Sequence, residues 1–265
     1  MSAESTKKML VVVLGVCIVC SILVSAAAVS LKPRQEANKK HEKLKNILLA
    51  GDLLKEDSDV EKIYNENIRP VLINIETGEV VPESEIDPEL NPREYDLKSV
   101  ASNPKYSTEI PSGKDIAGIR TRPKFLPVYE VISNGEIESL ILPIYGKGLW
   151  STMYGFIALD KDLRTIKGFT FYEHGETPGL GGEVDNPKWK AQWKNKMAYD
   201  ENGNVLIEVI KGKVDPSSPA ANHQIDGLSG STLTTRGVHN LVRFWLGEMG
   251  YSSLIKRLKE ERTHG

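Results

Sequence analysis

Residues 9–31 read MLVVVLGVCIVCSILVSAAAVSL, and they divide the chain into two unlike parts. This stretch lies between Lys8 and Lys32 and contains twenty-three uncharged residues. At 1.5 Å per residue, a helix of that length spans about 34 Å, slightly more than the hydrocarbon core of a bilayer. The pattern predicts a transmembrane helix over residues 9–31, preceded by a short N-terminal segment over residues 1–8.

A cleaved signal peptide is the alternative interpretation of this stretch. Lys7 and Lys8 form a basic start, and the three alanines of residues 26–28 satisfy a small-x-small cleavage pattern. The apolar run exceeds the roughly 7–15 residues of a signal core, which favours a retained anchor. The C-x-x-C spacing of Cys17 and Cys20 also occurs in redox motifs, but within an apolar helix it favours two small apolar residues.

The orientation of this anchor stays open from the charges alone. Two lysines precede the apolar segment, and six basic residues follow it: Lys32, Arg34, Lys39, Lys40, Lys43 and Lys45. By the positive-inside count, the large part of the chain would be cytoplasmic. That count holds for short loops, whereas a long domain is translocated largely regardless of charge.

Composition excludes several classes of protein. The chain has 265 residues, 34 basic and 36 acidic, with a net charge of -2, which argues against nucleic acid as a partner. The only two cysteines lie in the apolar segment, which excludes a disulfide scaffold and a four-thiolate metal site made by this chain alone. With 40% hydrophobic residues, the remainder is ordinary globular material.

Two segments of different character follow the anchor. Residues 32–55 are rich in helix formers, with Leu44 and Ile47 near the end and Gly51 as a stop, and they predict a charged, mostly solvated stalk helix. Residues 56–265 are expected to form one domain. Its first part, residues 56–122, is acidic and proline-containing, which predicts irregular wrapping with a few strands.

The second half of the chain alternates strand and helix signals. Asn134-Gly135 favours a two-residue hairpin turn between strands over residues 128–133 and 137–145. Further strands are predicted over three ranges: 156–159, 165–172 and 205–210. Helices are predicted after the Asn186-Pro187 cap and from Thr234 to Gly250, where apolar residues recur at helical spacing. The fold class is therefore α+β with a mostly antiparallel sheet, without the regular βα periodicity of a doubly wound fold.

The sequence DGLSGSTLTTRG, residues 226–237, is the candidate functional segment of the chain. It is a loop of small and hydroxyl residues that leads into a helix N-terminus, where free N–H groups and the helix dipole favour an anion. Arg236 can add a charge-assisted bond if it faces inward. A simple Ser/Thr helix cap with a flexible approach is the alternative interpretation.

Asp226, Ser229, Gly230, Ser231 and Thr232 resemble the D-x-x-S-G-A-T signal by which a flavin transferase attaches FMN, through its phosphate, to a threonine. Ser231 stands where alanine is usual. The resemblance implies that Thr232 is the acceptor and that Asp226 serves in recognition by the transferase or in its metal binding. The neighbouring threonines do not align with the acceptor position.

The whole chain resembles one family, the C subunit of the sodium-translocating NADH:quinone oxidoreductase. The resemblance rests on the Lys-Lys-x-Leu start of the apolar segment, on VSAAAV at residues 24–29, on GKGLWSTMYG at residues 146–155, on ETPGLGGE at residues 176–183 and on the flavinylation loop. The related G subunit of ferredoxin:NAD oxidoreductase complexes shares the anchor and the loop. The opening anchor sequence and the long segment over residues 56–122 are more similar to the sodium pump.

The resemblance implies a covalent FMN, with no catalytic acid or base and no metal ligand on this chain. The residues it suggests around the flavin are Glu176, Thr177, Gly179, Leu180, Leu233, Thr234, Trp150, Lys211 and Lys213. Each group has an ordinary alternative: a tight surface loop after Glu176, core packing for Trp150, and a solvent-facing pair for the lysines.

The resemblance also implies a place for the protein in the cell. It describes a subunit of a six-subunit, Na+-transporting NADH:ubiquinone reductase in the bacterial inner membrane, with its main domain periplasmic. Electrons would pass from an iron centre held by membrane partner subunits to this FMN, and on to the flavin of the B subunit toward quinone. A membrane-anchored module that binds an anion or serves as a scaffold is the alternative from a different class.

Overall fold

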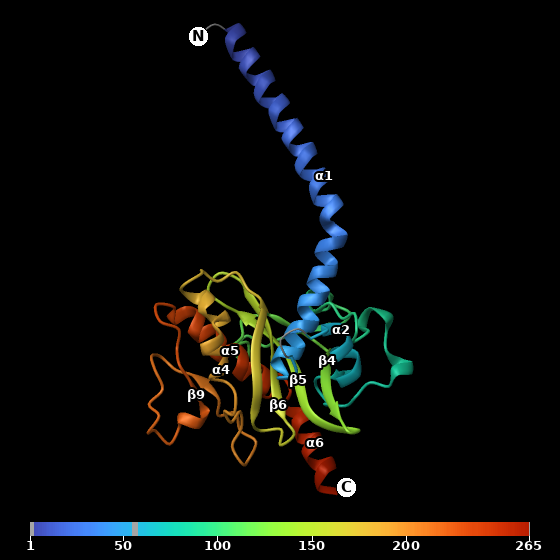
Figure 1. Cartoon of the computed structure of the whole chain (residues 1–265), viewed down its shortest axis with the longest axis vertical. Helices are drawn as coiled ribbons and strands as arrows, with labels where there is room; N and C mark the ends of the chain where they lie inside the picture. The colour runs from blue at the N-terminus through green and yellow to red at the C-terminus, as the bar shows by residue number, and fades with distance from the viewer. Residues whose placement is uncertain (1–2, 55–57, 265) are drawn as a thin grey trace. The chain divides into compact units, whose positions relative to one another are not determined.

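The computed structural model describes residues 3–54 and 58–264 (Figure 1). It divides into two compact units, Met1–Lys43 and Leu44–Gly265, and each is described by itself. The predicted boundary between stalk and domain at residues 55 and 56, and the start of the predicted N-terminal segment at residues 1 and 2, lie outside the described residues.

The first unit belongs to helix α1, Ala3–Ala50, which is one continuous helix through residues 26–28 (Figure 1). It contains a stretch apolar and long enough to cross a membrane, and none of that stretch is buried. Cys17 and Cys20 are free and exposed on it. An apolar surface of this length, unpaired with protein, is suited to lipid.

The second unit is built on one five-stranded sheet in the order β1-β4-β5-β6-β7. Its strands are β1 Ile68–Asn74, β4 Phe125–Ser133, β5 Glu136–Lys147, β6 Thr152–Asp160 and β7 Ile166–Glu173. Every neighbouring pair is antiparallel. The predicted α+β class with a mostly antiparallel sheet is therefore confirmed.

The turn between β4 and β5 forms where the sequence predicts it. Asn134 and Gly135 both have positive φ angles, 52° and 83°, as a type I′ hairpin requires. Ser133 consequently pairs with Glu136 across a two-residue loop. Strand β5 then runs to Lys147, and a second hairpin over residues 148–151 leads into β6.

Both faces of the sheet are covered, and β5 alternates between them. Ile141 packs with Ile47 and Leu48, which end α1, and with helix α2, Val60–Asn67. Leu140 and its alternate neighbours pack instead with helix α5, Thr232–Leu246. The end of the predicted solvated stalk therefore contributes to the core of the second unit, because Ile47 and Leu48 are fully buried there.

The remaining elements are short. They are η1 Glu83–Glu85, η2 Pro88–Leu90, α3 Leu97–Ser102, β2 Ser107–Glu109, β3 Thr121–Pro123, η3 Gly181–Asp185, α4 Pro187–Ala191, β8 Glu208–Val209, η4 Ala221–His223, β9 Gln224–Ile225 and α6 Ser252–His264. Strand β8 pairs with β9 in parallel. The described part of residues 56–122 is largely irregular, as expected, but it also supplies α2 and the edge strand β1 of the main sheet.

Two predicted helix boundaries differ from the structure. Helix α5 begins at Thr232, two residues before the predicted start, and ends at Leu246. Gly247 ends the helix because its backbone is extended, with φ −86° and ψ −167°, and α6 follows as a separate helix that the sequence pattern did not predict. The predicted strand over residues 205–210 is reduced to the two residues of β8.

Candidate functional site

The small-residue loop reaches the N-terminus of α5, and Thr232 is the first residue of that helix. Ser231 occupies the N-cap position, but its side chain makes no capping hydrogen bond. The N–H groups of the first helical turn lack carbonyl partners within the helix. This end of α5 therefore presents N–H donors and the positive end of the dipole without a capping hydrogen bond from Ser231.

Burial separates the three threonines of this helix turn. Thr232 is exposed, whereas Thr234 and Thr235 are 1% and 7% exposed. Both buried hydroxyls are also engaged: Thr234 donates to Glu176, and Thr235 accepts from the N–H of Leu228. Thr232 is thus the hydroxyl of the three that a modifying enzyme can reach.

Asp226 is held in place by segments distant in sequence. Its Oδ1 accepts the N–H of Val214 at 2.8 Å, and its Oδ2 accepts from Nε2 of Gln192 at 3.3 Å. Its backbone N–H donates to Oε1 of Gln192, and its carbonyl accepts from the indole of Trp189. In this structure Asp226 shapes the loop from within.

Glu176 lies at the centre of a second network and is only 5% exposed. Its Oε1 accepts the N–H of Trp150 at 3.0 Å, and its Oε2 accepts the N–H of Leu149 at 3.3 Å and the hydroxyl of Thr234 at 2.5 Å. The carboxylate thereby connects the β5–β6 hairpin, the loop after β7 and the first turn of α5.

This environment lowers the pKa of Glu176. Burial alone raises it, but hydrogen bonds from Thr234 and from backbone N–H groups of the hairpin outweigh burial, so the pKa lies below its ordinary value. The carboxylate is consequently ionised near neutral pH and acts as a fixed acceptor.

Glycines allow these three segments to approach. A Cβ at Gly148 would lie 2.5 Å from Oε1 of Glu176, and one at Gly181 would lie 2.6 Å from Oγ1 of Thr234. A Cβ at Gly237 would lie 2.5 Å from the carbonyl of Lys147. The glycine-bearing stretches singled out in the sequence, residues 146–155, 176–183 and 226–237, therefore form one site.

Large apolar side chains remain exposed around this site. They are Leu149, Trp150, Leu180 and Leu233, with exposed fractions between 41% and 67%. A Cβ at Gly230 would lie 3.2 Å from Cδ2 of Leu180, which places that side chain against the loop before Thr232. Exposed apolar side chains on adjoining segments are suited to a planar ring or a partner surface.

The predicted cofactor residues fall into two groups. Thr177, Gly179, Leu180, Leu233 and Trp150 are exposed and available to a ligand, and Gly179 has a φ of 74°. Glu176 and Thr234 face inward and hold the segments together. Their predicted contact with a cofactor stays a prediction.

The predicted lysines lie beside the loop that leads into α5. Lys211 and Lys213 are exposed, and Gly212 between them accepts the N–H of Gly227 at 2.8 Å. Among the described residues, neither lysine forms an ion pair. Two free ammonium groups next to a helix N-terminus strengthen the positive character of this surface.

His174 holds the loop that precedes Glu176. Its Nε2 lies 2.7 Å from Oδ2 of Asp185, and its Nδ1 accepts the N–H of Glu176 at 3.2 Å. The Asp185 carboxylate raises the pKa of His174 against the opposing effect of burial. The described residues contain no group of three or more potential metal ligands.

Sequence reasoning missed several residues of the site. Gln192 and Trp189 anchor Asp226, and Leu149 adds to the exposed apolar group. A helix was predicted after Asn186-Pro187, but nothing in its spacing pointed to Asp226, 37 residues beyond Trp189. Only folding brings these residues together.

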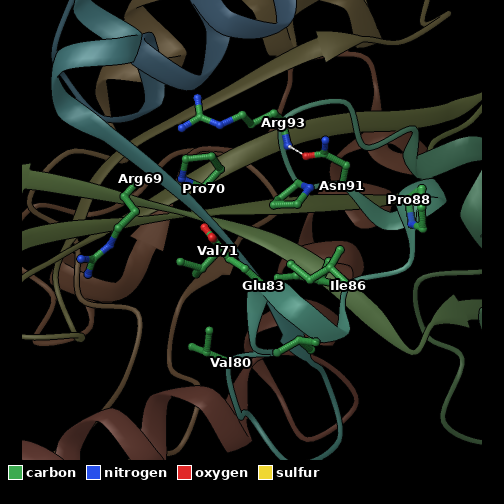
Figure 2. Close-up of a pocket in the computed structure, with 12 residues that line it drawn as sticks. Arg69, Pro70, Val71, Val80, Glu83, Ile86, Pro88, Asn91 and Arg93 are labelled. Carbon is green, nitrogen blue, oxygen red and sulfur yellow. Dashed lines mark hydrogen bonds between the residues drawn. The ribbon is translucent and has the colours of Figure 1, made fainter.

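Two hollows in the described surface lie outside this network. One, of about 350 Å³, runs along edge strand β1 and is lined by residues such as Pro70, Val71 and Ile86 (Figure 2). At its rim, the N–H of Arg93 donates to Oδ1 of Asn91. The other, of about 360 Å³, lies beside the ends of β5 and β6. None of the predicted site residues lines either hollow.

Comparison with known proteins places the chain among well-defined relatives. A family model described as an FMN-binding domain matches residues 148–247. The C subunit of the Na(+)-translocating NADH-quinone reductase from Pseudomonas aeruginosa is 44% identical over 260 residues, 97% of both chains. The protein of the same name from Yersinia pestis is 40% identical over 97% of this chain and 94% of its own length.

Solved structures agree with these matches. The match to the crystal structure of Shewanella oneidensis NqrC covers 84% of this chain and 99% of that chain, with a TM-score of 0.76 and 37% sequence identity. The C subunit of the Na(+)-translocating NADH-quinone reductase from Parabacteroides distasonis covers 86% of this chain and 96% of its own, with a TM-score of 0.63 and 28% identity.

Proposed function

The chain belongs to the family of C subunits of Na(+)-translocating NADH-quinone reductases, and from that membership we propose that it carries FMN as a phosphoester on Thr232 and relays electrons within that complex. The exposure of Thr232 at the bare N-terminus of α5 is the observation that carries the proposal. Of the three threonines in this helix turn, it alone is exposed.

The surroundings of Thr232 fit the phosphate of FMN. Uncapped N–H groups of α5 favour a phosphate, and the lysines at 211 and 213 supply nearby positive charge. Gly230, with a φ of 74°, turns the chain in the left-handed region just before the helix. The loop therefore exposes the acceptor hydroxyl without burying it under a side chain.

The exposed apolar residues fit the ring. Trp150, Leu180 and Leu233 come from three segments that Glu176 and Thr234 hold together. They can cover part of an isoalloxazine and leave another part accessible, which electron exchange with partner subunits requires. A bound FMN supplies the redox chemistry itself. The role of this chain is to hold, orient and partly shield it.

The wider role follows from the same family membership. We propose that the partners are the FMN-binding B subunit and the membrane subunits that hold an iron centre, with a flavin transferase needed for maturation. The path runs from the iron centre through this FMN to the B-subunit flavin and onward to ubiquinone. Na+ transport belongs to the whole complex, an inner-membrane translocase.

In this proposal residues 9–31 cross the membrane and residues 1–8 are cytoplasmic. The stalk over residues 32–55 and the domain over residues 56–265 then lie outside the cytoplasm, as the family membership suggests. Protease added to spheroplasts should then cleave the large domain without lysis. Protection of the domain until the membrane is broken would contradict the orientation while leaving the flavin assignment untouched.

Mass measurement tests the attachment. In cells that express the flavin transferase, the peptide containing Thr232 should carry the added mass of FMN, and denaturing chromatography should not remove the yellow colour. Thr232→Ala should abolish the attachment, whereas Thr108→Ala, on exposed strand β2, should keep it. Colour that separates from denatured wild-type protein would support a reversible anion-binding module instead.

A further inference from the structure

A pocket of about 360 Å³ opens beside the ends of β5 and β6, apart from the network around Glu176. Its walls come from α3, from the loop before β3 and from the two strand ends. Three cations line it, Lys98, Arg120 and Lys147, together with the hydroxyl residues Ser102, Thr121 and Thr152. No carboxylate belongs to its lining.

The charges in this pocket are only partly balanced. Lys98 pairs with Glu173 at 2.5 Å. Among the described residues, Arg120 and Lys147 form no ion pair, although both face the same hollow. Two cations from different segments, each without an ion pair of its own, are therefore available to a bound anion.

Nearby carboxylates are already engaged. Both oxygens of Asp115 accept backbone N–H groups, Oδ1 from Ile119 at 3.0 Å and Oδ2 from Arg120 at 2.8 Å. Asp96 caps α3 through the N–H groups of Lys98 and Ser99. These acids shape the walls, and their oxygens point to backbone donors.

The loop that carries Arg120 is held in an uncommon conformation. Arg120 has a φ of 65°, in the left-handed region that non-glycine residues seldom adopt, and the Asp115 contact on its N–H holds it there. This hydrogen bond fixes the backbone of Arg120, which belongs to the pocket lining.

The donors in the pocket define the ligand class. The hydroxyl of Thr121 donates to the carbonyl of Ala101, and that of Ser102 donates to the carbonyl of Lys98, so these donors are used. Arg120 and Lys147, which form no ion pair among the described residues, supply a guanidinium and an ammonium group. Such a pair matches a tetrahedral phosphate, and we propose that this pocket binds a phosphate group.

The pocket is connected to the flavin site through the β5–β6 hairpin. Lys147 and Thr152 are register partners at the two ends of this hairpin, and both line the pocket. Between them, the N–H groups of Leu149 and Trp150 donate to Glu176. Phosphate in the pocket therefore contacts both ends of the hairpin whose tip carries exposed Trp150.

Titration of the full-length chain in uncharged detergent with inorganic phosphate tests the proposal. Sodium chloride at matched ionic strength is the reference, and calorimetry and the fluorescence of Trp150 are the readouts. We expect saturable binding in the millimolar range or tighter, and Arg120→Gln combined with Lys147→Gln should weaken it by about tenfold or more. Trp150→Phe should remove the fluorescence change and keep the heat signal.

Two controls locate the binding. Lys114→Gln, on the same loop but outside the pocket lining, should bind phosphate as the wild type does. Lys256→Gln, an exposed lysine of α6 outside the pocket lining, should also leave binding unchanged. Unchanged binding in the Arg120 and Lys147 variant, or no saturable binding in the wild type, would overturn the proposal.

The source of the phosphate group is distinguished in a second arm. Wild-type chain in nanodiscs of phosphatidylcholine should respond to added inorganic phosphate if the ligand is a free phosphate. A response that needs phosphatidylglycerol, and that the Arg120 and Lys147 variant lacks, identifies a lipid headgroup as its source. The response that counts in both arms is the part lost in the Arg120 and Lys147 variant, so failure of this proposal is distinguishable from failure of the function proposed for Thr232.

Discussion

The hydroxyl of Thr234 donates a 2.5 Å hydrogen bond to Oε2 of Glu176, and both side chains are buried. The bond spans 58 residues of sequence and connects the first turn of α5 to the loop after β7. Because Glu176 also accepts N–H groups of the β5–β6 hairpin, this contact sets the relative position of the three segments around the proposed flavin site.

Replacing Thr234 with valine should destabilise the protein. The change keeps the side-chain shape and removes one donor from a buried carboxylate, which should lower the free energy of unfolding by about 1.5–3 kcal/mol. Urea unfolding measures this. Thr108→Val, at an exposed position of β2, is the matched control and should change the value by less than about 0.5 kcal/mol. Equal effects of the two variants would show that the hydrogen bond between Thr234 and Glu176 adds nothing to the stability of the protein.

The stability contributed by Glu176 should depend on pH. Burial raises the pKa of this carboxyl. The hydrogen bonds that it accepts lower the pKa by more than burial raises it, so the pKa lies below the ordinary value of 4.5. Its stabilising contribution is therefore complete above that value and is lost as the pH falls through the lowered pKa of the folded state. Unfolding free energies of the wild type and of Glu176→Gln should converge on acidification; a constant difference would refute the assignment.

Gly148 should tolerate no larger side chain. A Cβ there would lie 2.5 Å from Oε1 of Glu176, and relief of that clash would displace the carboxylate. Gly148→Ala should therefore cost about 1–3 kcal/mol in thermal unfolding. Gly113→Ala, where no atom lies within 4 Å of the added Cβ, should have little effect. A tolerated Gly148→Ala would mean that the hairpin shifts freely.

Asp226 should matter to the fold even without a transferase. Asp226→Ala removes the acceptors for the Val214 N–H and the Gln192 amide, and should destabilise the flavin-free protein by about 1–3 kcal/mol. Asp215→Ala is the control, since that exposed carboxylate accepts hydrogen bonds from Ser217 within one turn. Unchanged stability with lost flavinylation would assign Asp226 to recognition alone.

Ser231→Ala should be nearly neutral. Ser231 occupies the N-cap position of α5 without making a side-chain hydrogen bond, so its loss should cost less than about 0.5 kcal/mol and leave flavin attachment intact. Asn186→Ala offers the contrast, because the Asn186 side chain accepts the N–H of Lys188 and caps α4. That change should cost about 1 kcal/mol. A marked drop in flavinylation of Ser231→Ala would show a direct role for the hydroxyl.

Much of the second unit follows from short-range patterns. Asn134-Gly135 indicates its hairpin because both residues readily adopt positive φ angles, and the apolar spacing after Thr234 indicates α5 because the helical period is local. The membership of β1 in the main sheet was not predicted, because β1 pairs with β4, whose residues lie about 60 positions away in the sequence. Helix α6 was missed because charged residues dominate it and its apolar face is narrow.

The sequence by itself determined the apolar segment over residues 9–31, the antiparallel α+β character and the small-residue loop before α5, because each depends on neighbours along the chain. Only the tertiary structure decided that Thr232 is exposed while Thr234 and Thr235 are buried, and that Glu176 serves as an internal acceptor. The physical reason is that burial and long-range hydrogen bonds arise when the sheet and α5 pack together, and no local spacing encodes which side chains then meet.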